Sequence, residues 1–138
     1  MTETIPKQYL PSGVPDYSGI TILVAEDIEA NFLLIEAILK RTNAKIIWAK
    51  DGREAVEQCI HDCSLVKLAL LDIKMPVMTG LEAAFKIKKH CPFLPVIAQT
   101  AYAQVHDRQE AYSAGCDDYI EKPFTPMRLL DVIQKHIN

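Results

Sequence analysis

Five short apolar runs, each of strand length, alternate along this chain with segments of helical period. The runs occupy residues 20–25, 46–49, 68–71, 95–98 and 119–120. They are apolar throughout, which is typical of strands that helices cover on both faces. Strands that alternate with helices of about ten residues imply βαβ units and a parallel sheet. We therefore expect a single α/β domain, a doubly wound (βα)5 parallel sheet.

Apolar residues at helical spacing mark the segments between these runs. The first stripe comprises Ile28, Phe32, Ile35 and Leu39, the second Ala55, Val56, Cys59 and Ile60, and the third Leu81, Ala84, Phe85 and Lys88. The aliphatic part of the Lys88 side chain must extend outward from this third stripe. A fourth helix is expected from about Val105 to Gly115, a residue suited to a left-handed cap. A fifth, with Thr125 as N-cap and Pro126 at its first position, carries a stripe that ends at His136.

The length of 138 residues suits one domain. Residues 1–19 contain three prolines and two glycines without a regular period, which predicts a linker or flexible tail before a domain at 20–138. A formal charge of -3 does not favour a nucleic-acid binder. No apolar run approaches the roughly 18 residues that span a bilayer, and the first ten residues do not resemble a signal peptide. We expect a soluble, cytoplasmic domain without membrane contact.

The four cysteines do not form a convincing metal site. Within Cys59-Ile60-His61-Asp62-Cys63, the two cysteines share a helix face while His61 points away. A second ligand pair at finger-like spacing is absent from the sequence. We therefore expect buried or unreactive thiols at Cys59, Cys63, Cys91 and Cys116.

Polar residues follow four of the five apolar runs. They are Glu26-Asp27 after the first, Asp72 after the third, Gln99-Thr100 after the fourth and Glu121-Lys122-Pro123 after the fifth. An open parallel sheet binds its ligands beyond the carboxyl ends of its strands. The topology should therefore gather three carboxylates, a hydroxyl and an ammonium group in one shallow pocket.

Such a pocket has a specific chemical use. Two carboxylates about 4 Å apart repel each other by roughly 4 kcal/mol at an effective dielectric near 20. A raised pKa, a nearby cation or a bound metal must offset this repulsion. Oxygen ligands favour Mg²⁺. With its charge partly offset, Asp72 could attack phosphorus, while Lys122 and the Thr100 hydroxyl meet the other phosphoryl oxygens.

From Ile20 to about Ile137 the chain resembles the receiver (response-regulator) domain of two-component signalling. The resemblance rests on VAED at residues 24–27, LLDIKMPVMTG around Asp72, QTA with Thr100, and DDYIEKPF with Lys122. It implies a flavodoxin-like sheet with strand order 2-1-3-4-5. It also implies that Asp72 accepts a phosphoryl group from a phosphohistidine on a partner, either a histidine kinase or a histidine phosphotransfer domain.

The resemblance implies roles for the neighbouring residues. Glu26, Asp27, Asp72 and the backbone carbonyl of Lys74 would hold Mg²⁺, with Mn²⁺ as a possible substitute, and the Lys122-Pro123 bond would be cis. Thr100 and Tyr119 would move on phosphorylation, changing the surface of the fourth helix, fifth strand and fifth helix. The Lys74 side chain either affects the lifetime of the aspartyl phosphate or points into solvent.

The wider context stays open. The stretches AEDIEANFLLIEAILKR and TAYAQVHDRQEAYSAGCDDYIEKPF are most similar to receivers of hybrid histidine kinases, and the alternative is a stand-alone regulator that acts by docking. The isolated chain would accept phosphoryl groups, with possible autodephosphorylation, and would not be a kinase. A phosphatase that uses an aspartate nucleophile is disfavoured because Lys74 stands where its general acid would be. A flavin or dinucleotide carrier would need a glycine loop where AEDIEAN supplies acids, and a receiver-like module without chemistry would lack an acid or the lysine.

Overall fold

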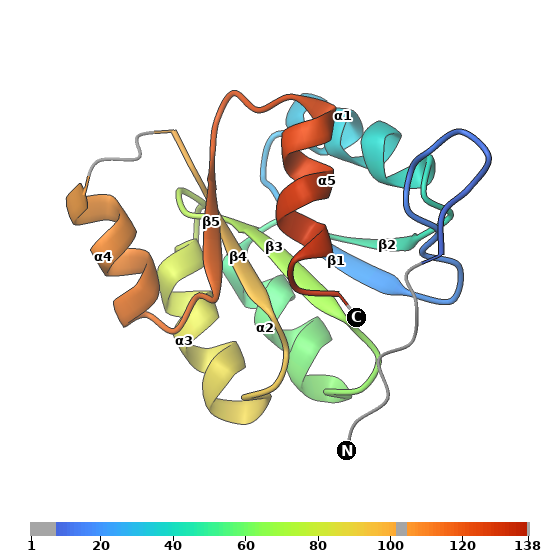
Figure 1. Cartoon of the computed structure of the whole chain (residues 1–138). Coiled ribbons are helices and arrows are strands. Elements are labelled where there is room, and N and C mark those ends of the chain that lie inside the picture. Colours follow the sequence, from blue (N-terminus) through green and yellow to red (C-terminus); the bar gives the residue numbers. More distant parts are fainter. Residues whose placement is uncertain (1–7, 102–104, 138) are drawn as a thin grey trace, which may run out of the picture.

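The computed structural model describes residues 8–101 and 105–137, and it confirms the expected fold (Figure 1). The sheet has the order β2-β1-β3-β4-β5 with every neighbouring pair parallel. Its strands are β1 (Thr21–Ala25), β2 (Lys45–Ala49), β3 (Leu68–Asp72), β4 (Val96–Thr100) and β5 (Asp118–Glu121). Among the described residues, no helix combines the length and the apolar character that crossing a membrane requires.

A helix follows each strand. The five helices are α1 (Glu29–Lys40), α2 (Gly52–His61), α3 (Gly80–His90), α4 (Val105–Ser113) and α5 (Pro126–Gln134). The predicted start of α5 is confirmed, because the Thr125 hydroxyl accepts a hydrogen bond from the Arg128 N–H at 3.1 Å. Gly115, beyond the end of α4, has a φ of 99°, the left-handed conformation expected there.

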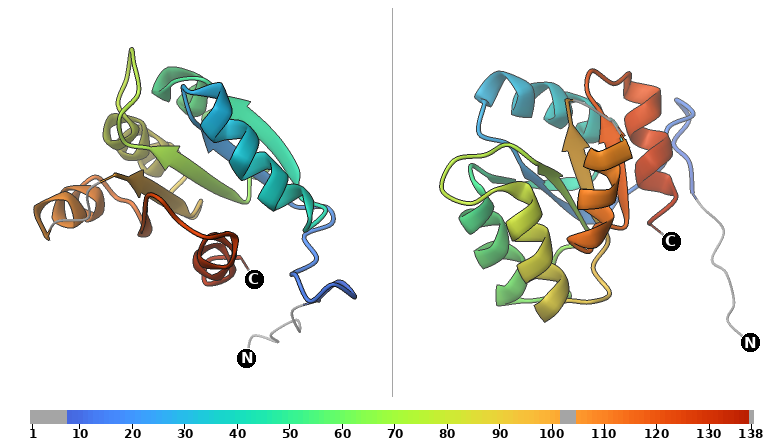
Figure 2. Two further views of the ribbon diagram at one scale, coloured as in Figure 1. Left: turned by 90° about the horizontal axis from the view of Figure 1, so that it is seen from above. Right: turned by 90° about the vertical axis from the view of Figure 1, so that its left-hand side faces the viewer.

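Alternate strand residues supply two separate cores. Ile22 and Val24 of β1 belong to the core beneath α1 and α5, whereas Leu23 and Ala25 belong to the core beneath α2, α3 and α4. The alternation follows from the two-residue period of a strand. Figures 1 and 2 show the sheet between these two groups of helices. Apolar residues are therefore needed at successive strand positions.

Three residues of the predicted helical stripes are exposed rather than buried. Ile28 is 53% exposed because it is the N-cap of α1 and precedes the helix. Phe85 is 59% exposed and Ile60 37%, since α2 and α3 turn narrower faces to the core than the periodicity predicts. The Lys88 side chain is only 19% exposed, and its Nζ donates hydrogen bonds at 3.0 Å to the Leu94 carbonyl and to the Asp117 carboxylate.

The strands also extend further than their apolar runs. The fourth run was expected to end at residue 98, yet β4 continues through Gln99 and Thr100. The reason is pairing, because Gln99 lies opposite Asp72 of β3, and Thr100 lies opposite Glu121 of β5. The polar residues of the pocket are therefore fixed by the sheet itself.

Residues 8–19 lie against the domain. Tyr9 and Pro15 form an antiparallel bridge, and the buried Tyr17 donates its backbone N–H to the Thr42 carbonyl after α1. Gln134 of α5 donates its side-chain amide to the Tyr9 hydroxyl at 3.4 Å. The segment therefore contacts both helices on one side of the sheet. Its use as a linker stays a prediction.

The expectation of free thiols is wrong for two of the four cysteines. Cys63 and Cys91 form a disulfide with their Cα atoms 5.5 Å apart. The two residues are 28 positions apart in sequence and meet because α2 and α3 pack side by side in one core. Cys59 and Cys116 are free and buried, as expected.

Candidate functional site

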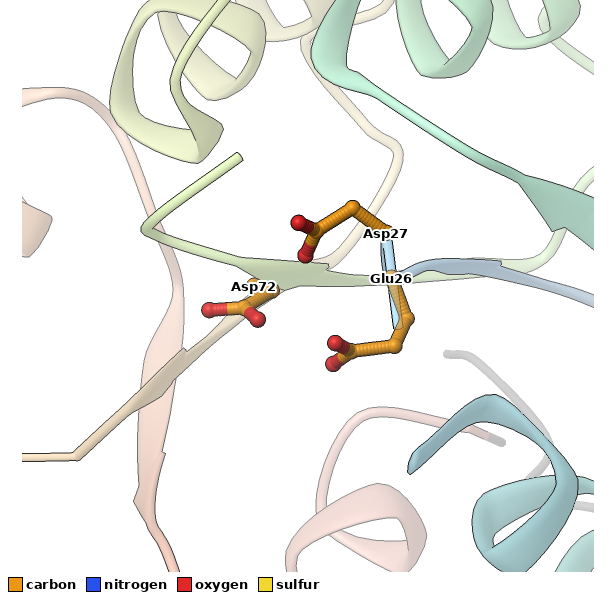
Figure 3. Close-up of side chains that lie close together, drawn as sticks. All are labelled: Glu26, Asp27 and Asp72. Atoms are coloured by element: carbon orange, nitrogen blue, oxygen red, sulfur yellow. The ribbon is translucent and has the colours of Figure 1, made fainter. Parts of the chain in front are cut away.

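The register of the sheet places the acids together. Ala25, the last residue of β1, pairs with Leu71 of β3, so Glu26 and Asp72 follow at the same level. Asp27 comes next in the chain. Figure 3 shows the three side chains close together, two carried by the end of β1 and one by the end of β3.

One carboxylate oxygen from each of Glu26, Asp27 and Asp72 lies within 4.8 Å of the others. Their environments differ. Glu26 is fully buried, Asp72 is 8% exposed, and Asp27 faces solvent. Carboxylates at this spacing repel one another strongly unless a cation intervenes.

Lys122 supplies one such cation from the residue that follows β5. Its Nζ lies 3.0 Å from Asp72 Oδ2 and 3.2 Å from Glu26 Oε2. The Lys122 N–H donates to the Thr100 carbonyl at 2.7 Å, which fixes the lysine backbone against β4. The bond between Lys122 and Pro123 is cis, as the resemblance implies. The ammonium group therefore bridges the nucleophile candidate and the buried glutamate.

The electrostatics of the cluster follow from this arrangement. Burial, and then the charge of Asp72, raise the pKa of Glu26 above its usual value, and Lys122 offsets part of that rise. Burial alone would lower the pKa of Lys122. The hydrogen bond and charge of Asp72, together with Glu26, outweigh that effect and raise the lysine pKa. Lys122 therefore carries its positive charge at neutral pH.

Glu26 is held from a second direction by α1. Its Oε1 accepts hydrogen bonds from the Ile28 N–H at 3.3 Å and from the Asn31 amide at 3.4 Å. The Trp48 indole donates to the Glu26 carbonyl at 2.8 Å. These contacts fix the longer glutamate side chain where it meets both Lys122 and Asp72, and they place the single tryptophan of the chain beside the site.

The turn after β3 closes over Asp72. The Lys74 N–H donates to Asp72 Oδ1 at 3.2 Å, and the exposed Lys74 side chain helps line a cavity of about 470 Å³ above the acids. α3 begins directly against this turn. A Cβ added to Gly80 would lie 2.1 Å from the Asp72 carbonyl oxygen, so only glycine permits this approach.

The two predicted switch residues lie on neighbouring strands. Thr100, at the end of β4, is buried and lines the cavity. Tyr119, on β5, is held by α4, because its hydroxyl accepts a hydrogen bond from Arg108 at 3.2 Å and its ring meets Tyr112 edge-on at 6.0 Å. The Arg108 guanidinium also lies 5.8 Å from the Tyr119 ring centre.

The sequence did not predict several residues that line the cavity or contact Tyr119. Asn31, Asp107 and Glu110 line the cavity, and Arg108 contacts Tyr119. The helical period alone gave no signal for them, because each is a polar residue on a helix whose apolar stripe points elsewhere. Gly80 stands at the end of the quoted LLDIKMPVMTG motif, so its spacing from Asp72 was a usable signal.

The cluster fits a small divalent cation. Asp27 and Asp72 offer carboxylate oxygens toward the cavity, and Glu26 lies within reach of both. An all-oxygen set with room for water suits Mg²⁺, which usually keeps several waters and takes few protein ligands. The ammonium of Lys122 contacts Asp72 and Glu26 as well, so with a cation bound an incoming anion would meet two positive charges.

Comparison with known proteins gives a consistent result. A family model described as "Response regulator receiver domain" matches residues 22–134. The chain is 35% identical, over 84% of its length, to "Hybrid signal transduction histidine kinase I" of Dictyostelium discoideum, and it spans 7% of that protein.

Solved structures agree with this match. The receiver domain of the sensor histidine kinase PA1611 of Pseudomonas aeruginosa, which has a magnesium ion in its active-site cleft, is 31% identical with a TM-score of 0.78, and the match covers 85% of this chain and 96% of that one. The chain is also similar to a structure in which the receiver domain of Ssk1 from Saccharomyces cerevisiae is crystallised with the phosphotransfer protein Ypd1. The identity is 26% and the TM-score 0.79, and the match covers 85% of this chain and 88% of that one.

Proposed function

Since the chain belongs to the response regulator receiver domain family, we propose that it accepts a phosphoryl group on Asp72 from a phosphohistidine of a partner protein. The observation that carries this proposal is the position of Asp72, which is linked to Lys122 and lies within 4.8 Å of two further acids. Such a carboxylate is oriented by its partners and lines a cavity of about 470 Å³.

The proposed transfer exchanges one bond for another. An Asp72 oxygen attacks phosphorus, the new O–P bond forms, and the P–N bond to the partner histidine breaks with its electron pair returning to the imidazole. Lys122 stabilises the charge on the phosphoryl oxygens, and the buried Thr100 hydroxyl lies on the cavity wall where it can donate to them. Asp27, Asp72, the Lys74 carbonyl and Glu26 would hold Mg²⁺ or, in its place, Mn²⁺, which would supply charge neutralisation.

We place the docking surface for the partner beside this cavity, on α1 and the turn after β5. Leu33 and Leu34 of α1 are 49% and 60% exposed. A groove of about 380 Å³ runs between Leu34 and Phe124 and shares Lys122 with the acidic cavity. A helical phosphotransfer domain fits this continuity, because its apolar face could cover the groove while its histidine enters the cavity. The complex of the yeast receiver with Ypd1 supports a partner of this kind.

Phosphorylation would change the surface of α4, β5 and α5. A phosphoryl group on Asp72 would draw the Thr100 hydroxyl toward it, and Tyr119 would leave Arg108 and Tyr112 to fill the space. A switch of this kind biases an equilibrium between two packings. The match to a hybrid kinase supports a parent protein in which a kinase supplies the phosphoryl group, and a stand-alone docking regulator is the alternative. We expect the domain to lie on the cytoplasmic side in either case.

The proposal is tested by incubating the chain with Mg²⁺ and acetyl phosphate, followed by intact mass measurement. The expected result is the addition of one phosphoryl group that the Asp72→Asn variant does not acquire. Asp131→Asn, an exposed aspartate on α5, serves as the matched control and should be labelled normally. Absence of an adduct under conditions that label another receiver, or equal labelling of the Asp72→Asn variant, would overturn the proposal.

A further inference from the structure

The disulfide between Cys63 and Cys91 joins the distal ends of two neighbouring helices. Cys63 follows the end of α2, and Cys91 caps α3. Cys63 is exposed, whereas Cys91 is 3% exposed. A cavity of about 430 Å³ opens beside the bond, with Lys67, His90 and Phe93 among its lining residues. A small thiol can therefore reach one sulfur of the pair directly.

The remaining two cysteines cannot take part at neutral pH. Burial raises the pKa of the Cys59 thiol to about 12. Burial, and then the charge of Asp117, raise the pKa of Cys116 to about 12 as well. Because the thiolate is the reactive form, both groups stay protonated and inert. Thiol chemistry on this domain is therefore confined to the bonded pair.

The same two helices contact the turn from Asp72 to Gly80 at their other ends. A Cβ on Gly80, the first residue of α3, would lie 2.1 Å from the Asp72 carbonyl oxygen. A Cβ on Gly52, the first residue of α2, would lie 2.3 Å from the Met78 carbonyl oxygen. The two helices pack against each other and share one core, in which Ala55 and Cys59 of α2 join Ala84 of α3. A change in how they sit at one end is therefore transmitted to the turn at the other.

We propose that Cys63–Cys91 is a reversible redox site, and that reduction of its bond weakens the hold of α2 and α3 on the turn from Asp72 to Gly80. The consequence is a lower affinity of the acid cluster for Mg²⁺. This inference rests on the proposed function in one respect, because it takes the cluster of Glu26, Asp27 and Asp72 as the cation site. The coupling is carried by packing, since the bond lies at the opposite end of both helices from the acids.

Reduction proceeds by thiol–disulfide exchange with a low-molecular-weight thiol such as glutathione. Its thiolate attacks the exposed Cys63 sulfur, the bond between the two cysteines breaks, and Cys91 leaves as a thiolate that takes a proton. A second glutathione then attacks the mixed disulfide and releases Cys63. Two electrons pass to the protein, and glutathione disulfide is the product.

The first arm of the test measures reversibility on the full chain. The folded protein is equilibrated in buffers with increasing ratios of reduced to oxidised glutathione and quenched with acid. It is then unfolded and alkylated, and its intact mass is measured. The expected oxidised form carries two alkylated cysteines and the reduced form four, because the chain has four cysteines. Four alkylated cysteines in every oxidising buffer, or two in every reducing buffer, would overturn the proposal.

The second arm measures Mg²⁺ binding in each redox state by the fluorescence of Trp48, whose indole donates a hydrogen bond to the Glu26 carbonyl. Reduction is expected to weaken binding by about two- to tenfold. Cys63→Ala, an exposed position, should bind like the reduced form and ignore glutathione. Equal affinity in the two states would refute the inference and leave the proposed function standing. Absence of Mg²⁺ binding in both states would count against the cation site itself.

Discussion

Replacement of Gly80 by alanine tests the close approach of α3 to the turn that follows Asp72. In a helix, glycine to alanine ordinarily raises stability by about 0.5–1 kcal/mol, because alanine restricts the unfolded chain. At Gly80 the new Cβ would lie 2.1 Å from the Asp72 carbonyl oxygen, a separation that real Cβ atoms do not show. The helix and the turn must therefore separate by about 1 Å in a close-packed region.

The expected magnitude follows from these opposing effects. Overpacking of this kind destabilises by about 1–3 kcal/mol, and the gain in helix propensity offsets part of it. A net loss of about 1–2 kcal/mol is expected. For 138 residues the entropy of unfolding is about 0.3 kcal/mol per kelvin, so the thermal midpoint should fall by about 3–7 °C. The displacement of Asp72 should also slow phosphoryl uptake by about ten- to a hundredfold.

Two assays check this expectation. Differential scanning calorimetry gives the thermal midpoint, and intact mass against time in Mg²⁺ and acetyl phosphate gives the rate of uptake. Glu82→Ala, an exposed substitution two residues further along in the first turn of the same helix, controls for general effects on α3. A Gly80→Ala variant that is more stable than the unchanged chain and is phosphorylated at the same rate would refute the reasoning.

Two further outcomes concern Glu26 and Arg108. Because the pKa of Glu26 is raised by burial and by Asp72, its contribution to stability is full below the unfolded pKa and is lost as the pH rises through the folded pKa. In urea denaturation with a chelator, Glu26→Gln should gain stability relative to the unchanged chain as the pH rises from about 4.5. A pH-independent difference would contradict this. Arg108→Ala removes the hydrogen bond to Tyr119, worth about 1 kcal/mol, and should raise the population of rotated Tyr119 about fivefold in NMR of labelled tyrosine. Arg53→Ala on α2 is the control, and an unchanged Tyr119 population would show that Arg108 does not restrain it.

The convergence of the acids and the lysine could be predicted because a parallel sheet has one carboxyl edge. Once the five apolar runs were read as parallel strands, Asp72 and Lys122 had to lie at the same rim although they are 50 residues apart. The strand ends were less predictable, since backbone pairing extends β4 through Gln99 and Thr100 after the apolar run has stopped. The roles of Asp72 and Lys122 in phosphoryl transfer remain predictions, which the assays above test.

Contacts between helices were beyond the reach of periodicity. The bond between Cys63 and Cys91 depends on where the ends of α2 and α3 come to lie, and this is set by packing rather than by spacing. The contact of Arg108 with Tyr119 likewise depends on the position of α4 over β5. A stripe of apolar residues identifies the face that is buried and leaves the partners of the polar face undetermined.

The packing of residues 8–19 bears on where this domain starts. A fragment cut to the matched residues 22–134 would lack Val14 and Tyr17, which are buried in the core shared by α1 and α5. It would also lose the hydrogen bond that Tyr17 donates to the Thr42 carbonyl. Val14 and Tyr17 cover part of this core, so the packed part of the chain begins upstream of β1. Shorter recombinant versions would expose apolar side chains to water.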